Sequence, residues 1–271
     1  MPELPEVETA KRGLEARLLG RQITAFVQHR PDLRFPLPPA LPERLVGCRI
    51  LGFDRRAKYI LIALDSDHRL MLHLGMSGRL LFDGPGAGKH EHLTFEFDDG
   101  TILRYVDARR FGMLDLVANA EIERHPRLAT LGLEPLDPAF DGKALERVLV
   151  GRASPVKTAI MNQKLVVGVG NIYACESLFR AKISPTRNAC SLKPREHRRL
   201  AVTIRTVLTD AISAGGSSLR DYVQTDGELG YFQHQFEVYG RAELPCLVCG
   251  TPIRKVVQAN RTTFYCGRCQ Q

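Results

Sequence analysis

The sequence predicts an α+β multidomain protein with an N-terminal β-sandwich, a helical middle and a small metal-bound hairpin at its C-terminal end. Three observations predict this class. Short apolar runs separated by turn residues fill residues 23–117, and the apolar spacing becomes helical after two prolines in residues 132–138. Four cysteines then gather between residues 246 and 269. A chain of 271 residues is long enough for more than one such domain.

The first residues predict a helix with a reactive tip. Apolar residues recur there at helical spacing, at Val7, Ala10, Leu14 and Leu18. If Met1 is removed after synthesis, Pro2 becomes the N-terminus, and an α-amine with a reference pKa of about 7.7–8.0 is a usable nucleophile near neutral pH. Glu3 stands beside it as a candidate for moving protons. An ordinary capped helix containing two prolines explains the same residues, and on them alone it is the more frequent case.

The region after this helix predicts a β-sandwich with an antiparallel hairpin at Asp98-Asp99-Gly100. The candidate strands are Ile23–Gln28, Cys48–Phe53, Tyr59–Leu64, Leu70–Leu74, Leu93–Phe97, Thr101–Val106 and Met113–Val117. Basic residues stand near their ends: Arg55–Lys58 is expected to open a strand, and Ala108–Gly112 to lie in a turn. Basic residues beside Met and Phe suit a surface that grips a nucleic-acid backbone, although each one singly is more often a solvated charge or a core residue.

The middle of the chain predicts helices and one glycine-rich connection. The helix candidates are Gly142–Val150, Val156–Lys164, Asn171–Ala181 and Pro194–Ala214. Gly168–Asn171 separates two of them, and Asn171 is expected to cap the next helix, whose N-terminus would favour a phosphate. A plain helix–turn–helix connection explains these four residues equally well. The polar, glycine-containing stretch 224–236 is expected to be a mobile loop.

Positive charge is concentrated in the C-terminal half. Residues 151–271 hold 17 Lys and Arg against 8 Asp and Glu, whereas residues 1–150 hold 21 against 22. A basic half beside a neutral one favours a polyanionic partner, most commonly nucleic acid, and a solvated basic surface is the alternative. The apolar runs are too short to span a bilayer and no secretory signal opens the chain, which predicts the cytoplasm and no membrane contact.

The C-terminal cysteines predict one structural zinc ion. Two CxxC pairs, Cys246/Cys249 and Cys266/Cys269, are separated by sixteen residues. Four thiolates give a closed tetrahedral site with no open position for water, so the metal would replace a hydrophobic core and take no part in catalysis. Two strands, Ile253–Gln258 and Thr262–Tyr265, are expected between the pairs, with residues 259–261 at their turn. A redox pair is the alternative, and the doubled motif disfavours it.

Taken together, these stretches resemble the bacterial formamidopyrimidine-DNA glycosylase family. The matching text runs from end to end: MPELPEVET, RRAKY, HLGMSG, DARRFG, KLVVGVGNIYACESLF, GYF and the final CxxC…NRTTFYCxxC. The resemblance implies a monomeric repair enzyme that excises oxidised purines from double-stranded DNA and then cleaves the abasic strand, without a small-molecule cofactor. It implies a catalytic β-sandwich domain at 1–132, a helix–two-turn–helix domain at 133–223, the loop at 224–236 and a zinc finger at 237–271. A nucleoid-associated place in the cytoplasm follows from the same resemblance.

The resemblance also implies roles for single residues. Pro2 matches the Schiff-base nucleophile and Glu3 the general acid. Lys58 matches a lysine assigned to proton donation in β-elimination, and Arg261 matches an arginine assigned to δ-elimination. The void left by the flipped base would be filled by Met76, Arg109 and Phe111. Other DNA contacts fall on His73, His90, Arg109, Arg152 and Asn171. Arg152 lies in a poorly matching stretch, so Lys157 is an alternative for that contact.

Two other functions compete with this one. Endonuclease VIII, which prefers oxidised pyrimidines, usually starts with MPEGPE, whereas position 4 here is Leu and the Met76, Arg109 and Phe111 motifs follow the purine-specific pattern. A non-catalytic zinc-ribbon protein that binds DNA is the alternative of another class. The presence of Pro2 and Glu3 together argues against it, as does that of Lys58 and Arg261.

Overall fold

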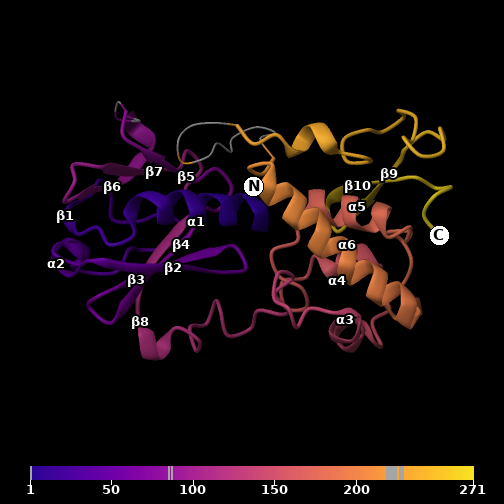
Figure 1. Cartoon of the computed structure of the whole chain (residues 1–271), viewed down its shortest axis with the longest axis horizontal. Coiled ribbons are helices and arrows are strands. Elements are labelled where there is room, and N and C mark those ends of the chain that lie inside the picture. Colours follow the sequence, from indigo (N-terminus) through magenta and orange to yellow (C-terminus); the bar gives the residue numbers. More distant parts are fainter. Residues whose placement is uncertain (1, 85, 87, 218–224, 226–228) are drawn as a thin grey trace. The chain divides into compact units, whose positions relative to one another are not determined.

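The computed structural model describes residues 2–84, 86, 88–217, 225 and 229–271, which form two compact units (Figure 1). Unit 1 comprises residues 1–129 and 214–231, and unit 2 comprises residues 130–213 and 232–271. Within the described ranges, no helix is both long and apolar enough to cross a membrane.

Unit 1 is built from two antiparallel sheets that share one core with the first helix, α1 (Leu4–Leu18). One sheet has the order β2-β3-β4-β8, with bounds Ile50–Arg56, Tyr59–Leu64, His68–His73 and Met113–Ala118. The other has the order β1-β6-β7-β5, with bounds Ile23–Gln28, Glu91–Phe97, Ile102–Val106 and Arg79–Phe82. Fully buried Leu14 of α1 packs in the same cluster as Ile60 of one sheet and Leu93 of the other, so the expected sandwich and its leading helix are confirmed.

Three details of unit 1 bear on the sequence prediction. Helix α2 (Leu41–Leu45) and strand β5 were missed because five and four residues are too few to show a period. The basic stretch Arg55–Lys58 does not open a strand: Arg55 and Arg56 end β2, and a tight turn at Ala57-Lys58 leads into β3. The hairpin at residues 98–100 joins β6 to β7 as expected.

Unit 2 contains four α-helices and a two-stranded hairpin among its described residues. The helices are α3 (Gly142–Leu149), α4 (Val156–Ile160), α5 (Asn171–Arg180) and α6 (Pro194–Ser213), and the strands are β9 (Arg254–Gln258) and β10 (Arg261–Tyr265). The predicted apolar face of α6 is confirmed, since Leu200, Ile204 and Val207 are fully buried. Helix α4 ends four residues early because the Asn162 side chain accepts the Lys164 N–H, and such a local bond competes with helix continuation.

The stretch predicted as a mobile loop, 224–236, lies partly outside the described residues, at 224 and 226–228. Its last part forms a short 3-10 helix, η4 (Phe232–Gln235). Phe232 is fully buried and its ring centroid lies 5.7 Å from that of Tyr173 on α5.

Candidate functional site

The N-terminal tip of α1 is held by a buried carboxylate network. Glu3 is the N-cap residue, and its N–H donates to Glu6 Oε2 at 2.8 Å. The other oxygen of Glu6 accepts the Ser217 N–H at 2.9 Å. Glu3 and Glu6 are only 4% and 3% exposed, and Pro2 is buried as well. Sequence reasoning missed Glu6, although the Glu3-x-x-Glu6 spacing of a capping box was an available signal for it.

The hairpin that carries Lys58 is tied to the same helix. Arg55 Nε donates to Glu8 Oε2 on α1 at 2.9 Å, and Arg55 Nη1 donates to the Ala57 carbonyl at 2.8 Å. Burial opposes ionisation of Glu8, but hydrogen bonds from Arg12 and Arg55 prevail and hold the pKa of this carboxyl below its ordinary value. Ala57 has φ +54, a left-handed conformation that L-residues adopt only when their surroundings hold it. Lys58, 8% exposed, therefore extends from a braced turn.

The structure brings Met76, Arg109 and Phe111 together on two adjoining turns. We call residues 74–78 and 107–112 the wedge turns, because they carry the three residues expected to fill the void left by a flipped base. A Cβ added at Gly75 would lie 2.3 Å from the Phe111 carbonyl carbon, so the two backbones touch. The Arg109 guanidinium lies 5.2 Å from the Phe111 ring centroid, and Phe111 is 39% exposed although large and apolar. An exposed aromatic residue beside an exposed arginine can stack between bases.

His73 and His90 lie beside these turns in different roles. Burial lowers the pKa of His73 to about 4, with the positive charge of Lys58 as a further cause. The neutral ring accepts the Gly75 N–H at Nδ1, at 3.0 Å, which leaves Nε2 as a hydrogen-bond donor. His90 is half-buried at the end of the 3-10 helix η1 (Gly88–His90), and its carbonyl accepts the Asp107 N–H at 2.9 Å.

In unit 2, Arg152, Lys157 and Arg261 line one cavity of about 460 Å³. Lys157 is 1% exposed, and its Nζ donates to Asn171 Oδ1 at 2.6 Å and to Thr263 Oγ1 at 2.8 Å. The amide of Asn171 donates in turn to the Thr262 carbonyl at 2.8 Å. The cavity thus lies between α4 and the hairpin, and the bonds of Lys157 and Asn171 link both to α5. Three cationic side chains line it, as a phosphate site requires.

Two sequence predictions in this region were wrong in detail. Asn171 does not cap α5: Gly170 is the N-cap, and the Asn171 side chain is used by Lys157 and Thr262. Arg261 is the first residue of β10, and only Ala259 and Asn260 form the turn, both with positive φ. Two successive left-handed residues are typical of a tight two-residue hairpin turn, and this geometry fixes the direction of the Arg261 side chain that follows it.

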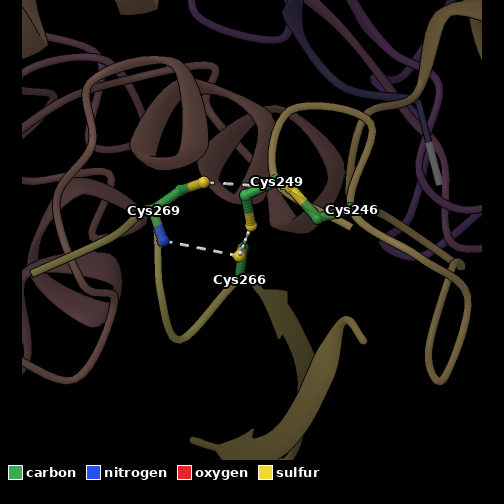
Figure 2. A group of neighbouring side chains, drawn as sticks. All are labelled: Cys246, Cys249, Cys266 and Cys269. Carbon is green, nitrogen blue, oxygen red and sulfur yellow. Dashed lines mark hydrogen bonds between the residues drawn. The ribbon is translucent and has the colours of Figure 1, made fainter. Parts of the chain in front are cut away.

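The four cysteines after residue 245 form a single cluster (Figure 2). Their sulfur atoms all lie within 4.8 Å of one another, with Cys246 Sγ 3.9 Å from Cys269 Sγ and Cys249 Sγ 3.5 Å from Cys266 Sγ. Tetrahedral Zn–S bonds of about 2.3 Å place sulfurs about 3.8 Å apart, so the donor set fits one structural zinc ion. The cluster packs against Cys175 and Phe179 of α5, which gives this small segment a core on one side.

One unit combines a four-cysteine finger with a cavity lined by cationic side chains, and the other unit exposes Arg109 and Phe111. This combination is typical of zinc-finger proteins that bind nucleic acid. Comparison with protein-family models identifies the family. The formamidopyrimidine-DNA glycosylase N-terminal domain matches residues 1–114, the H2TH domain of the same glycosylase matches residues 131–223, and a zinc finger found in FPG and IleRS matches residues 243–271. The chain belongs to the formamidopyrimidine-DNA glycosylase family.

Individual relatives agree over the full length. The chain is 53% identical to the formamidopyrimidine-DNA glycosylase of Dinoroseobacter shibae and 52% identical to that of Rhodospirillum centenum, covering 100% of each chain. The crystal structure of the MutM (Fpg) protein from Thermus thermophilus matches with a TM-score of 0.88 and 41% identity, over 99% of this chain and 98% of that one. The complex of Lactococcus lactis Fpg with abasic-site DNA matches with a TM-score of 0.91 and 36% identity, over 99% of both chains.

Proposed function

We propose that this chain is a base-excision repair enzyme that removes oxidised purines from duplex DNA with Pro2 as the covalent nucleophile. The observation that carries the chemistry is the tip of α1, where Glu6 accepts the N–H of buried Glu3, the residue that follows buried Pro2. The substrate class comes from family membership and from a relative, a mutant of the Lactococcus lactis Fpg, whose crystal structure is a complex with a DNA containing Fapy-dG.

The reaction begins when Pro2 is the N-terminal residue. Its lone pair attacks C1′ of the damaged nucleotide, the bond from C1′ to the base breaks, and the base leaves with a proton. Glu3 protonates the departing base, then takes the proton that the Pro2 nitrogen loses and passes it to the ring oxygen of the opening sugar. Loss of the ring oxygen from C1′ gives an iminium, a Schiff base between Pro2 and the sugar.

Strand cleavage follows from the acidity of that iminium. Loss of a C2′ proton expels the 3′ phosphate by β-elimination, and a second elimination expels the 5′ phosphate. Lys58 donates a proton in the first elimination, and Arg261 serves the second as a phosphate-contacting cation. Water then adds to the iminium and breaks its C–N bond, which frees Pro2 and leaves the sugar fragment as an aldehyde.

Access to C1′ requires that the nucleotide leave the base stack, which costs a few kcal/mol. Met76, Arg109 and Phe111 fill the gap and offset that cost. Arg152, or Lys157 in its place, contacts a phosphate. The remaining contacts come from His73, His90 and Asn171; His73 acts as a neutral donor through Nε2 because its pKa lies at about 4.

The same proposal covers organisation and setting. The proposed domains are residues 1–132, 133–223 and 237–271, and the enzyme acts as a monomer on double-stranded DNA. Its place is the bacterial cytoplasm, at the nucleoid.

Borohydride trapping tests the proposal. The purified protein is incubated with a duplex holding 8-oxoguanine opposite cytosine, reduced with borohydride, digested and mapped by mass spectrometry. We expect the DNA on Pro2, and a Lys58→Ala control should still give that adduct. A cross-link on Lys58 in the parent would overturn the nucleophile assignment, and trapping only on a duplex with an oxidised pyrimidine would overturn the substrate class.

A further inference from the structure

We propose that Asp107 is a positioning residue that sets the geometry of both wedge turns without touching DNA. The inference rests on the proposed function of Met76, Arg109 and Phe111, and adds the group that places all three. Asp107 is 0% exposed, so no ligand reaches its carboxylate.

One carboxylate binds donors from both turns. Its Oδ1 accepts the Ser77 hydroxyl at 2.5 Å, and it shares the Arg109 N–H, at 3.3 Å, with Ser77 Oγ, which accepts it at 3.1 Å. Its Oδ2 accepts the Gly112 N–H at 2.8 Å and the Tyr105 hydroxyl at 3.3 Å. Ser77 directly follows Met76, and Gly112 directly follows Phe111, so the two oxygens hold the backbone beside each wedge residue.

The backbone of Asp107 is fixed as well. Its carbonyl lies 2.7 Å from Nε2 of buried His92, and its N–H donates to the His90 carbonyl at 2.9 Å. The second bond connects the wedge turns to His90, another proposed DNA contact. Asp107 is therefore a junction of the turn, the neighbouring strand β6 and the 3-10 helix before it.

The carboxylate of Asp107 is bound by neutral donors. In the described part of the chain, no Lys or Arg forms an ion pair with Asp107, and its four side-chain partners are neutral N–H and O–H groups. Burial and the nearby Asp107 charge raise the pKa of Tyr105 well above its ordinary value, so this hydroxyl remains a donor. The free-energy cost of leaving a buried donor or acceptor without a partner is larger than the net stabilisation from one hydrogen bond.

The segment between the anchors needs them. Arg110 has φ +54, and a non-glycine residue keeps that conformation only when its neighbours are fixed. Asp107 anchors the segment at Arg109 and again at Gly112, on either side of Arg110 and Phe111. Relaxation of Arg110 would turn the Phe111 side chain away from its exposed direction, with no loss of any reacting group.

The experiment compares Asp107→Asn with Glu176→Gln, a matched control in unit 2. Glu176 is also 0% exposed and accepts the N–H groups of residues 237, 238 and 239 at 3.0, 3.1 and 2.8 Å. Both substitutions keep the side-chain shape and replace one acceptor oxygen by an amide donor. Each zinc-loaded variant is assayed for excision of 8-oxoguanine from duplex DNA and for cleavage of a pre-formed abasic site. The fluorescence of 2-aminopurine beside the lesion reports insertion into the stack.

We expect Asp107→Asn to lose about tenfold or more in excision from the lesion duplex, the loss that follows from about 1.4 kcal/mol of misplaced hydrogen bonding. Its abasic-site cleavage should change much less, and its 2-aminopurine signal should fall. Glu176→Gln should change both reactions in the same proportion. A proportional loss in Asp107→Asn, or an unchanged fluorescence signal, would show that Asp107 only stabilises the fold and would overturn the proposal.

A second variant and the parent protein keep the test decisive. If Asp107→Asn does not fold, Ser77→Ala removes one donor from the same carboxylate. It should lower the ratio of 8-oxoguanine excision to abasic-site cleavage, by less than Asp107→Asn would. An unchanged ratio would overturn the proposal. The parent separates the inference from its foundation. If the parent protein cannot excise 8-oxoguanine, the proposed function is refuted. If the parent is active but Asp107→Asn loses both reactions in proportion or leaves the 2-aminopurine signal unchanged, only the positioning role is refuted.

Discussion

Replacing Gly75 with alanine would separate the wedge turns from each other. Gly75 has φ +64, and the added Cβ would lie 2.3 Å from the Phe111 carbonyl carbon, 2.4 Å from its oxygen and 2.5 Å from the Gly112 nitrogen. These are backbone atoms, so the clash can be relieved only if one of the two turns moves away from the other. A left-handed alanine costs about 1–2 kcal/mol and overpacking adds about 1–3, for a loss of about 2–5 kcal/mol in the free energy of unfolding.

Gly20→Ala is the matched control. Gly20 has φ +77 and no heavy atom within 4 Å of an added Cβ, so only the conformational cost of about 1–2 kcal/mol applies. Urea unfolding of the zinc-loaded proteins, followed by circular dichroism, measures both variants, and excision of 8-oxoguanine measures the effect on Phe111. The close approach of the turns would be refuted if Gly75→Ala were no less stable than Gly20→Ala and equally active.

Three further predictions address the metal, the chemistry and the pH dependence. Cys246→Ser should lose zinc by metal analysis and abolish DNA binding while unit 1, which has its own core, stays folded; normal binding without zinc would contradict this. Phe111→Ala and Glu3→Gln should both act poorly on 8-oxoguanine and better on a pre-formed abasic site, but only Phe111→Ala should weaken binding of the lesion duplex; unchanged binding in both would remove the wedge role. Burial lowers the pKa of His73 from 6.5 to about 4, so the unfolded chain takes up the proton first and stability should fall by up to about 3 kcal/mol as the pH drops from 6.5 to 4. His73→Asn should flatten that part of the urea-midpoint profile, and an unaltered profile would exclude His73 as the source.

The elements that sequence could predict are those with a long period or a specific local signal. The apolar faces of α1 and α6 extend over fifteen and twenty residues, and the Asp98–Gly100 turn has one dominant geometry. Short elements such as β5 offer no period to detect. The end of α4 depends on one hydrogen bond, from the Lys164 N–H to the Asn162 side chain. A single local bond of this kind leaves no periodic pattern in the sequence.

The candidate site was predictable as a set of residues but not as a set of contacts. The motif positions name Pro2 and Phe111 without any folding information. The anchor between Glu6 and Ser217 joins residues 211 positions apart, and no spacing pattern reports such a pair. Lys157 was expected only as an alternative phosphate contact, and its burial depends on β10 reaching it from the far end of the chain.

The bond from Lys157 to Thr263 bears on how such proteins can diverge. A finger that folded around its metal alone could be exchanged between chains as an independent piece. Here Lys157 of α4 is buried and bonds to α5 and β10, and a finger without a hydroxyl at position 263 would remove one acceptor of its ammonium group. The finger of this chain and its helix α4 are therefore coupled: an exchange of the finger has to keep a hydroxyl at position 263 or change position 157 as well.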